Sequence, residues 1–337
     1  MISVIITAHN RKKFLLSALD SVLNQTLPRT LYEIIIVKNF IDPEIDEKIL
    51  QIKEKYGIKL VNIFCKDDEI GKKLIVGIDK SIGEVICILE DDDMFHPEKL
   101  STIYTVFSNP KIKFYHNMLK VFGEGYKRKG KIDSLFNTNI NSPIVVCDEQ
   151  KINAWKDLLL MGAGFNLSSM AIRRELVIKY KAIIEQINFA VDIALFYMAL
   201  IENGCIYIDN YVFTLFRLSK PDTYLHYDAS VWEYSKSIKY CRDLELLLSF
   251  FDGSYFNQAI LNDFTFWKAK CLFLSKLMHN RITVNFTIKD YYNSLKYLLI
   301  SKQKLRTKFR YFFALLLSLM PKFLVALITR YIDVLNF

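Results

Sequence analysis

The sequence predicts an α/β protein with a doubly wound, mostly parallel, Rossmann-like sheet, followed by an all-helical C-terminal region that associates with a membrane. Short runs of strand-forming residues alternate with helical segments up to about residue 90, which is typical of such a sheet. From Trp232 onward the apolar periodicity is helical only. The final segment combines apolar residues with many basic ones, a composition typical of membrane surfaces.

The order of the elements supports this fold class. Apolar residues at helical spacing predict a helix near residues 15–23, and a second helix is predicted over 74–81 with Gly83 as its cap. No Gly-x-Gly-x-x-Gly follows the first strand and no Gly-Lys-Ser/Thr loop is present, which disfavours dinucleotide-binding and P-loop enzymes. Strands are expected at 3–7, 32–37, 59–64 and 84–89, with further candidates at 115–121 and 144–147.

The fourth strand ends in four consecutive carboxylates, Glu90, Asp91, Asp92 and Asp93. Adjacent carboxylates repel one another, so burial at a strand end requires a cation such as Mg²⁺ or Mn²⁺. Ligands of open α/β sheets bind beyond the carboxyl ends of the strands, which makes this run a candidate metal-diphosphate site. The alternative is a solvated acidic turn that opens a helix at Pro97.

Composition places few constraints on the compartment. The 337 residues are 52% hydrophobic and 14% aromatic, which suits a packed core, and the start of the chain resembles a strand more than a signal peptide. The six cysteines show no Cys-x-x-Cys spacing, so we expect reduced, mostly buried thiols in a reducing compartment. They are Cys65, Cys87, Cys147, Cys205, Cys241 and Cys271.

The net charge of +9 is concentrated at the end of the chain, where residues 301–337 contain seven Lys or Arg and one Asp. These charges flank an apolar stretch, which favours an anionic membrane surface over nucleic acid as the partner. Pro321 and Lys322 interrupt the stretch, so we expect two short helices lying in the interface. A kinked transmembrane span and a buried helical hairpin are the alternatives.

Five motifs in order give the chain a resemblance to a known family. The segments 2–27, 32–40, 77–100, 161–177 and 188–209 resemble the nucleotide-binding half of family 2 glycosyltransferases, which have a GT-A fold. The resemblance covers about two-thirds of the chain. It implies a metal-dependent enzyme that uses Mg²⁺ or Mn²⁺ and a UDP- or GDP-linked sugar donor.

The resemblance also assigns the donor site. Asp92 and Asp93 correspond to the metal-binding end of the acidic motif, Asp91 to its variable position and Glu90 to the ribose contact. The sequence departs from the family at Lys38 and Asn39, where acidic residues are common. It also lacks the family's usual Asn and Arg before Gly83, although Lys72 and Lys73 lie nearby. The nucleoside pocket would be lined by Thr7, Ala8, His9, Asn10 and Lys38.

Four further assignments lie later in the chain. Gly164 would leave space for the donor sugar, although a plain turn also explains it. Arg217 would bind the diphosphate, and His226 would complete the metal shell unless it is an ordinary surface histidine. Asp192 aligns with the catalytic base, with Val191 in place of the family's first acid. Burying an ionised side chain among apolar residues costs free energy, which favours a functional role for Asp192. The alternative is a carboxylate at a helix start that faces solvent.

Together these features predict an inverting glycosyltransferase on the cytoplasmic face of a membrane, with Asp192 as general base and a lipid-linked glycan as acceptor. The expected domains are a catalytic domain over 1–230, a helical extension over 231–305 and membrane-associating helices over 306–337. A polyprenyl-phosphate glycosyl synthase, a nucleotidyltransferase and a non-catalytic membrane-bound scaffold are the rival interpretations.

Overall fold

The structure is a computed structural model that describes residues 1–10, 12–123, 140–218, 229–251, 253–254 and 256–277, with isolated residues between 287 and 320. The chain forms two compact units, Met1–Ser219 and Lys220–Phe337. The predicted boundaries at 230 and 305 remain predictions.

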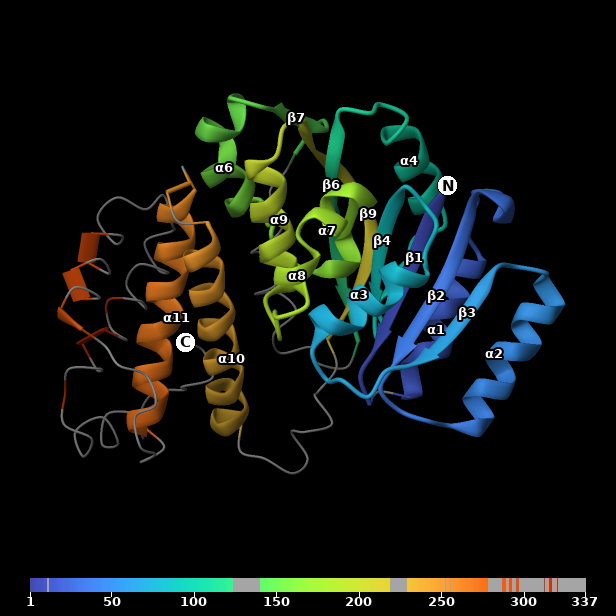
Figure 1. The fold of residues 1–337 in the computed structure, drawn as a ribbon, viewed down its shortest axis with the longest axis horizontal. Helices are drawn as coiled ribbons and strands as arrows, with labels where there is room; N and C mark the ends of the chain where they lie inside the picture. Colours follow the sequence, from blue (N-terminus) through green and yellow to red (C-terminus); the bar gives the residue numbers. More distant parts are fainter. Residues whose placement is uncertain are drawn as a thin grey trace. The chain divides into compact units, whose positions relative to one another are not determined.

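The described part of the first unit is built on one nine-stranded sheet with the strand order β3-β2-β1-β4-β8-β6-β9-β5, and β7 pairs with β9 (Figure 1). Strands β1 to β4 are mutually parallel, as predicted, whereas β8 is antiparallel to both β4 and β6. The sheet is therefore mixed. The strands are β1 (Ile2–Ala8), β2 (Tyr32–Lys38), β3 (Leu60–Phe64), β4 (Val85–Glu90), β5 (Met94–Phe95), β6 (Ile112–Phe122), β7 (Ile144–Cys147), β8 (Met170–Arg173) and β9 (Cys205–Arg217).

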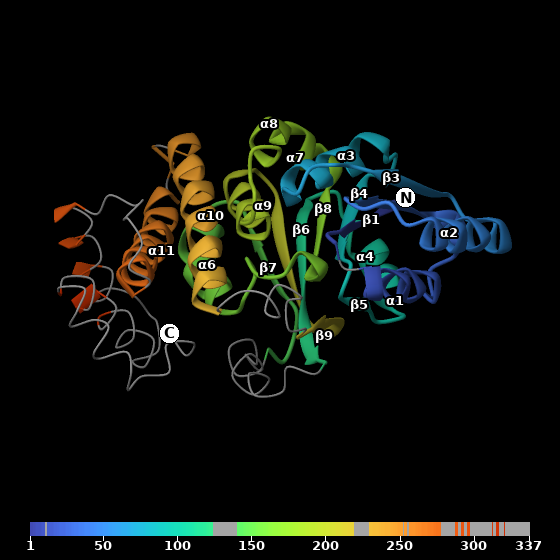
Figure 2. The same ribbon diagram turned by 90° about the horizontal axis from the view of Figure 1, so that it is seen from below.

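Helices cover both faces of the parallel half, so β1 and β2 are buried along their whole length. Figure 2 shows α3 (Ile70–Lys80), α7 (Arg174–Lys179) and α8 (Lys181–Ile184) on one side, and α1 (Lys12–Leu23) and α4 (Lys99–Val106) on the other. Val4 and Ile6 of β1 belong to the core that includes α1, α2 (Pro43–Tyr56) and α4. Ile5 points to the opposite face, where a Cβ added to Gly77 of α3 would lie 2.6 Å from its Cγ2 atom.

Gly83 has a different role from the predicted one. Helix α3 ends at Lys80 with Ser81 as its C-cap, so Gly83 does not cap it. A Cβ at Gly83 would lie 2.5 Å from the Ser3 Oγ atom, to which the Gly83 N–H donates a 2.8 Å hydrogen bond. Glycine is required here because the chain passes close to β1.

The second unit contains two long helices, α10 (Ala229–Phe250) and α11 (Asn257–Leu277). They pack against each other through aromatic residues, with the Tyr240 and Trp267 ring centroids 4.4 Å apart. None of the helices described is long and apolar enough to cross a membrane. The predicted interfacial helices fall almost entirely outside the described residues, so their membrane association remains a prediction.

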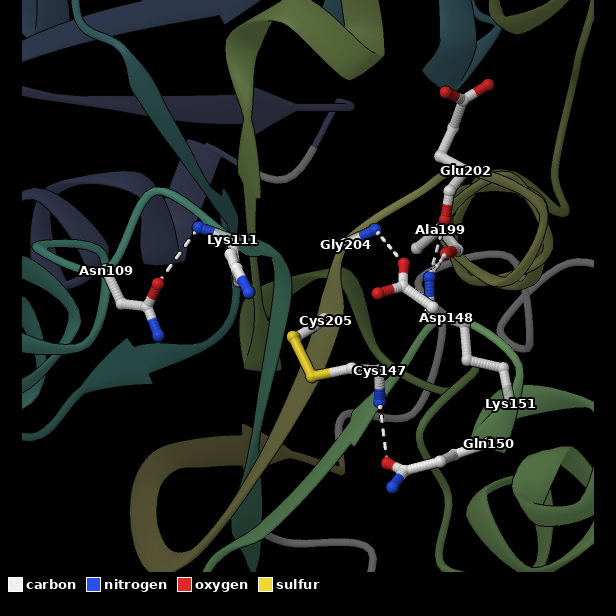
Figure 3. Close-up of a disulfide and its surroundings, with 10 residues drawn as sticks. All are labelled: Asn109, Lys111, Cys147, Asp148, Gln150, Lys151, Ala199, Glu202, Gly204 and Cys205. Carbon is white, nitrogen blue, oxygen red and sulfur yellow. Dashed lines mark hydrogen bonds between the residues drawn. A yellow bond between two sulfur atoms is a disulfide. The ribbon is translucent and has the colours of Figure 1, made fainter.

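Two of the six cysteines form a disulfide, which corrects the expectation of six thiols. Cys147 of β7 and Cys205 of β9 face each other in antiparallel register, with their Cα atoms 4.0 Å apart (Figure 3). They are 58 residues apart in sequence, so only the pairing of the strands brings them together.

Polar contacts beside the disulfide fix the same end of the sheet. The Lys151 ammonium donates hydrogen bonds to the carbonyls of Ala199 (3.1 Å) and Glu202 at the end of α9 (Val191–Ile201). Asp148 accepts a 2.7 Å hydrogen bond from the Gly204 N–H. Figure 3 shows these groups converging where α9 leads into β9. The hydrogen bonds of Lys151 therefore hold the C-terminal end of α9, and the disulfide holds the start of β9 that follows it.

We expect denatured, unreduced protein to react with a thiol reagent at four cysteines per chain, and reduced protein at six, because Cys147 and Cys205 are paired. Replacing both with serine should lower the free energy of unfolding by about 4 kcal/mol if the chain-entropy estimate for a loop of this length applies. Thiol titration and urea unfolding measure the two effects. Six reactive thiols in unreduced protein would contradict the pairing.

Candidate active site

The acidic run lies at the carboxyl end of β4, at the edge where β1 also ends. Thr7 of β1 pairs with Glu90 of β4, and the Asp91 N–H donates a 3.2 Å hydrogen bond to the Thr7 carbonyl. Glu90 is half-buried, whereas Asp91, Asp92 and Asp93 are buried, with Asp92 the most exposed of the three at 7%. The alternative of a solvated acidic turn is therefore wrong.

Asp93 receives hydrogen bonds from two distant segments. Its Oδ2 atom accepts from the Asn166 side-chain amide at 2.9 Å, and its Oδ1 atom accepts from the Arg217 backbone N–H at 2.8 Å. Burial, together with the neighbouring charge of Asp92, raises the pKa of Asp93 to about 7. The fold thus places two adjacent carboxylates where a positive charge would stabilise both.

These residues fit a divalent cation that shares its coordination with a substrate. No cluster of three His, Cys, Asp or Glu side chains in metal-binding geometry occurs among the described residues. Mg²⁺ is commonly held by one or two carboxylates together with substrate phosphates, so Asp92 and Asp93 are sufficient protein ligands. His226, the third predicted ligand, lies outside the described residues.

Arg217, at the end of β9, lies beside the same carboxylates. Its Nε atom donates a 2.8 Å hydrogen bond to the Asp92 carbonyl, and its guanidinium group lies over the rings of Phe14 and Phe122, each centroid 4.3 Å away. The guanidinium group is thus fixed beside the acidic run. Its fork of N–H donors has the geometry that suits a phosphate.

The predicted nucleoside pocket lies where β1 and β2 end. The His9 N–H donates to Asp91 Oδ2 at 3.1 Å, and the N–H of Asn10, which has a φ of 55°, donates to Asn39 Oδ1 at 2.9 Å. Thr7 and Ala8 are buried strand residues, while His9 and Asn10 are exposed. Backbone groups of β1 thus connect this pocket to the acidic run.

Lys38 does not fit its predicted role in nucleotide binding. Its side chain is buried, and its ammonium group is bound by Asp46 (2.9 Å) and by the Phe40 carbonyl (2.9 Å). A buried lysine requires such partners, and these attach the end of β2 to α2.

Three side chains that the sequence did not assign surround His9 instead. The Asn39 side-chain amide lies 3.1 Å from the His9 Nδ1 atom and 2.7 Å from an Asp68 carboxylate oxygen. The Lys73 ammonium lies 3.2 Å from the same His9 nitrogen and 3.3 Å from the Ala8 carbonyl. Asn39 and Asp68 follow the ends of β2 and β3, which is the only signal in the sequence that could have indicated them.

Asp192 occupies the first turn of α9 and is half-buried. Its Oδ2 atom accepts a 3.1 Å hydrogen bond from the Asn166 backbone N–H, and its Oδ1 atom accepts from the Ile193 N–H at 2.9 Å. Asn166 also binds Asp93, so this one residue joins the predicted base to the predicted metal site. The sequence analysis did not identify Asn166.

A buried lysine supports the segment that carries Asn166. The Lys99 ammonium donates to the Ser168 carbonyl and to Thr214 Oγ1 (2.9 Å), and burial lowers the pKa of Lys99 to about 7. Ser168 Oγ in turn accepts a 3.0 Å hydrogen bond from the Glu90 N–H. These contacts join the segment to β4, α4 and β9.

Gly164 packs against α9, and its space is filled by protein. An added Cβ would collide with the Cδ1 atom of Ile193, the neighbour of Asp192. Its predicted contact with the donor sugar remains a prediction.

Gly164→Ala should lower the free energy of unfolding by about 1–3 kcal/mol through overpacking. Ile193→Val removes the colliding methyl group and should alone cost about 0.5–1.5 kcal/mol. The double variant should therefore be more stable than the sum of the single effects predicts. Urea unfolding of all four proteins tests this, and strict additivity would contradict the contact.

Comparisons with known proteins agree with the predicted family. Residues 3–165 match the sequence model of glycosyl transferase family 2. An uncharacterized glycosyltransferase of Nostoc sp. is 33% identical over 111 residues, which are 33% of this chain and 34% of that protein. The chain thus matches only about a third of the length of this relative.

Two solved structures are similar in fold. TarS 1-349 of S. aureus in complex with UDP-GlcNAc has a TM-score of 0.53 at 16% identity, covering 93% of this chain and 79% of that one. The mannosyltransferase PcManGT of Pyrobaculum calidifontis, in complex with GDP-Man and Mn2+, has a TM-score of 0.57 at 11% identity, covering 99% and 87%. The mixed sheet with its flanking helices is thus similar to the fold of GT-A glycosyltransferase structures, as predicted, and residues 3–165 match glycosyl transferase family 2.

Proposed function

We propose that the chain transfers a sugar from a nucleoside-diphosphate sugar to an acceptor hydroxyl, with inversion at the anomeric carbon. The observation that supports this most directly is the hydrogen-bonded path from Asp93 through Asn166 to Asp192. One small residue thus contacts both a proposed cation ligand and the proposed base. A single displacement needs these two functions close together.

At the donor end, Asp92 and Asp93 would hold Mg²⁺ or Mn²⁺, which stabilises the charge of the departing diphosphate when bound. Arg217, already fixed against the Asp92 carbonyl, would bind a diphosphate oxygen. Glu90 is half-buried at the strand end, where we propose that it contacts the ribose. His9, with Asn39 and Asp68 beside it, would contact the base.

At the acceptor end, Asp192 would remove the proton of the attacking hydroxyl. The Asn166 and Ile193 backbone N–H groups donate hydrogen bonds to its carboxylate and so orient the proposed base. One base and one displacement from the opposite face invert the anomeric centre without a covalent intermediate.

UDP- and GDP-linked sugars are the proposed donors, because the two similar structures contain UDP-GlcNAc and GDP-Man with Mn2+. We further propose a lipid-linked acceptor and a position on the cytoplasmic face of a membrane. The support is the basic, apolar segment 301–337, which suits an anionic membrane surface.

We expect Asp92→Asn and Asp93→Asn each to reduce metal-dependent turnover of the donor at least about 100-fold, because each removes a proposed ligand. Metal-free Asp93→Asn should be at least as stable as wild type at pH 8, because the raised pKa of Asp93 means that its charge opposes folding above pH 7. Hydrolysis of a panel of nucleotide sugars and thermal unfolding measure these effects. Asp79→Asn, an exposed acid on α3, is the matched control.

Wild-type turnover in both variants would refute the metal assignment. Asp192→Asn separates the proposal from a polyprenyl-phosphate glycosyl synthase, whose phosphate nucleophile needs no strong base. Loss of hydroxyl glycosylation is the expected result, and retention of most activity would favour the synthase.

Deleting residues 309–337 should abolish binding to anionic vesicles, because this removes the apolar stretch and three of the seven basic residues of the tail. Sedimentation with vesicles of phosphatidylglycerol and phosphatidylcholine measures the effect at low and high salt. A truncated chain that still sediments would place the anchor elsewhere.

A further inference from the structure

Asn166 adopts a backbone conformation that is uncommon for residues other than glycine. Its φ is 68°, and it is one of three non-glycine residues with positive φ in the described part of the chain, the others being Asn10 and Asp148. Its side chain is buried at 3% exposure. Such a conformation costs free energy, so the surrounding contacts must stabilise it.

Three hydrogen bonds supply that stabilisation, and each uses a different group of Asn166. The backbone N–H donates to Asp192 Oδ2 (3.1 Å), the side-chain Nδ2 donates to Asp93 Oδ2 (2.9 Å), and the side-chain Oδ1 accepts from Ser169 Oγ (2.9 Å). The Ser169 contact orients the amide so that its NH₂ group faces Asp93. The backbone and the side chain of one residue therefore contact two different carboxylates.

Few residue types can make this arrangement. Glycine adopts the positive φ but has no side-chain donor, and alanine lacks the donor and disfavours the φ. Aspartate tolerates the φ but would add a carboxylate against Asp93 where a donor now lies. Asparagine combines the backbone conformation with a neutral donor.

We propose that Asn166 is a positioning residue that aligns the cation-binding carboxylate and the base with each other. The inference rests on the proposed function, in which Asp93 holds the cation and Asp192 accepts the proton. The side-chain hydrogen bond to Asp93, here called the side-chain arm, orients that carboxylate. The backbone hydrogen bond to Asp192, the backbone arm, orients the carboxylate at the start of α9. Donor-metal binding and base alignment are thus coupled through one residue.

The two arms can be separated by substitution. Asn166→Gly removes the side-chain arm and retains a backbone that favours positive φ, so Mn²⁺ affinity in the presence of UDP or GDP should fall about 10-fold. Its kcat at saturating Mn²⁺ should stay within about 3-fold of wild type, because the arm to Asp192 remains. Asn166→Ala disturbs both arms, so its kcat at saturating Mn²⁺ should fall a further 10-fold or more, as expected for a misplaced base.

Calorimetry with Mn²⁺ and the nucleotide gives the affinities, and donor turnover at saturating Mn²⁺ gives kcat. Asp148→Gly is the matched control, because Asp148 also has a positive φ (45°) but lies in the turn between β7 and α6 (Gln150–Leu160). It should change thermal stability without changing Mn²⁺ affinity or kcat. If Asn166→Ala does not fold, Asn166→Ser replaces it: serine also lacks the amide donor and disfavours the positive φ, so its kcat at saturating Mn²⁺ should likewise fall about 10-fold or more.

Unchanged Mn²⁺ affinity in Asn166→Gly, or equal kcat in the glycine and alanine variants, would overturn the positioning role. Wild-type protein that shows neither nucleotide-dependent Mn²⁺ binding nor donor turnover would instead overturn the proposed function. The two failures are therefore distinguishable.

Discussion

Burying carboxylates at the end of a central strand is the constraint on which this half of the molecule depends. Asp91, Asp92 and Asp93 lie out of solvent, and each added negative charge makes the next more costly to bury. The chain responds with donors from separate segments, including backbone N–H groups at His9 and Arg217 and the Asn166 amide. The segments that carry the proposed diphosphate ligand Arg217 and the proposed base Asp192 are thus tied to the acidic run by hydrogen bonds.

The hydrogen bonds offset only part of the cost of burying these carboxylates. The Lys99 ammonium is a nearby basic group, but burial lowers its pKa. It also donates its hydrogen bonds to Ser168 and Thr214. Hydrogen bonds do not prevent the pKa of Asp93 from rising to about 7. The cation proposed for this site would therefore meet two carboxylates that are already buried beside each other.

The sequence was informative where the signal is local. Continuous apolar runs identified β1, β2 and β4, because strands buried on both faces have no polar alternation, and the abrupt acidic end of β4 marked the site. The family resemblance located Asp192 and Arg217, which the structure places near Asp93 through Asn166 and through the Arg217 backbone. The short antiparallel strands β5 and β8 were not predicted, because short strands acquire their identity from pairing.

What the sequence missed depends on contacts between distant segments. Lys38 was assigned to the ligand, yet Asp46, eight residues later, binds its ammonium group once α2 forms. Asn166 and Asp68 have no motif of their own, since their importance comes from neighbours far along the chain. The disulfide is of the same kind, because its 58-residue span is bridged only by β7 pairing with β9.

That covalent link has a consequence for the pairing of β7. A strand that slips by one residue against its neighbour turns every side chain to the other face. The bond between Cys147 and Cys205 prevents such slippage of β7 against the start of β9, where the two strands pair from Cys205 to Ile208. The sulfur bridge therefore fixes which side chains of this short strand face each side of the sheet.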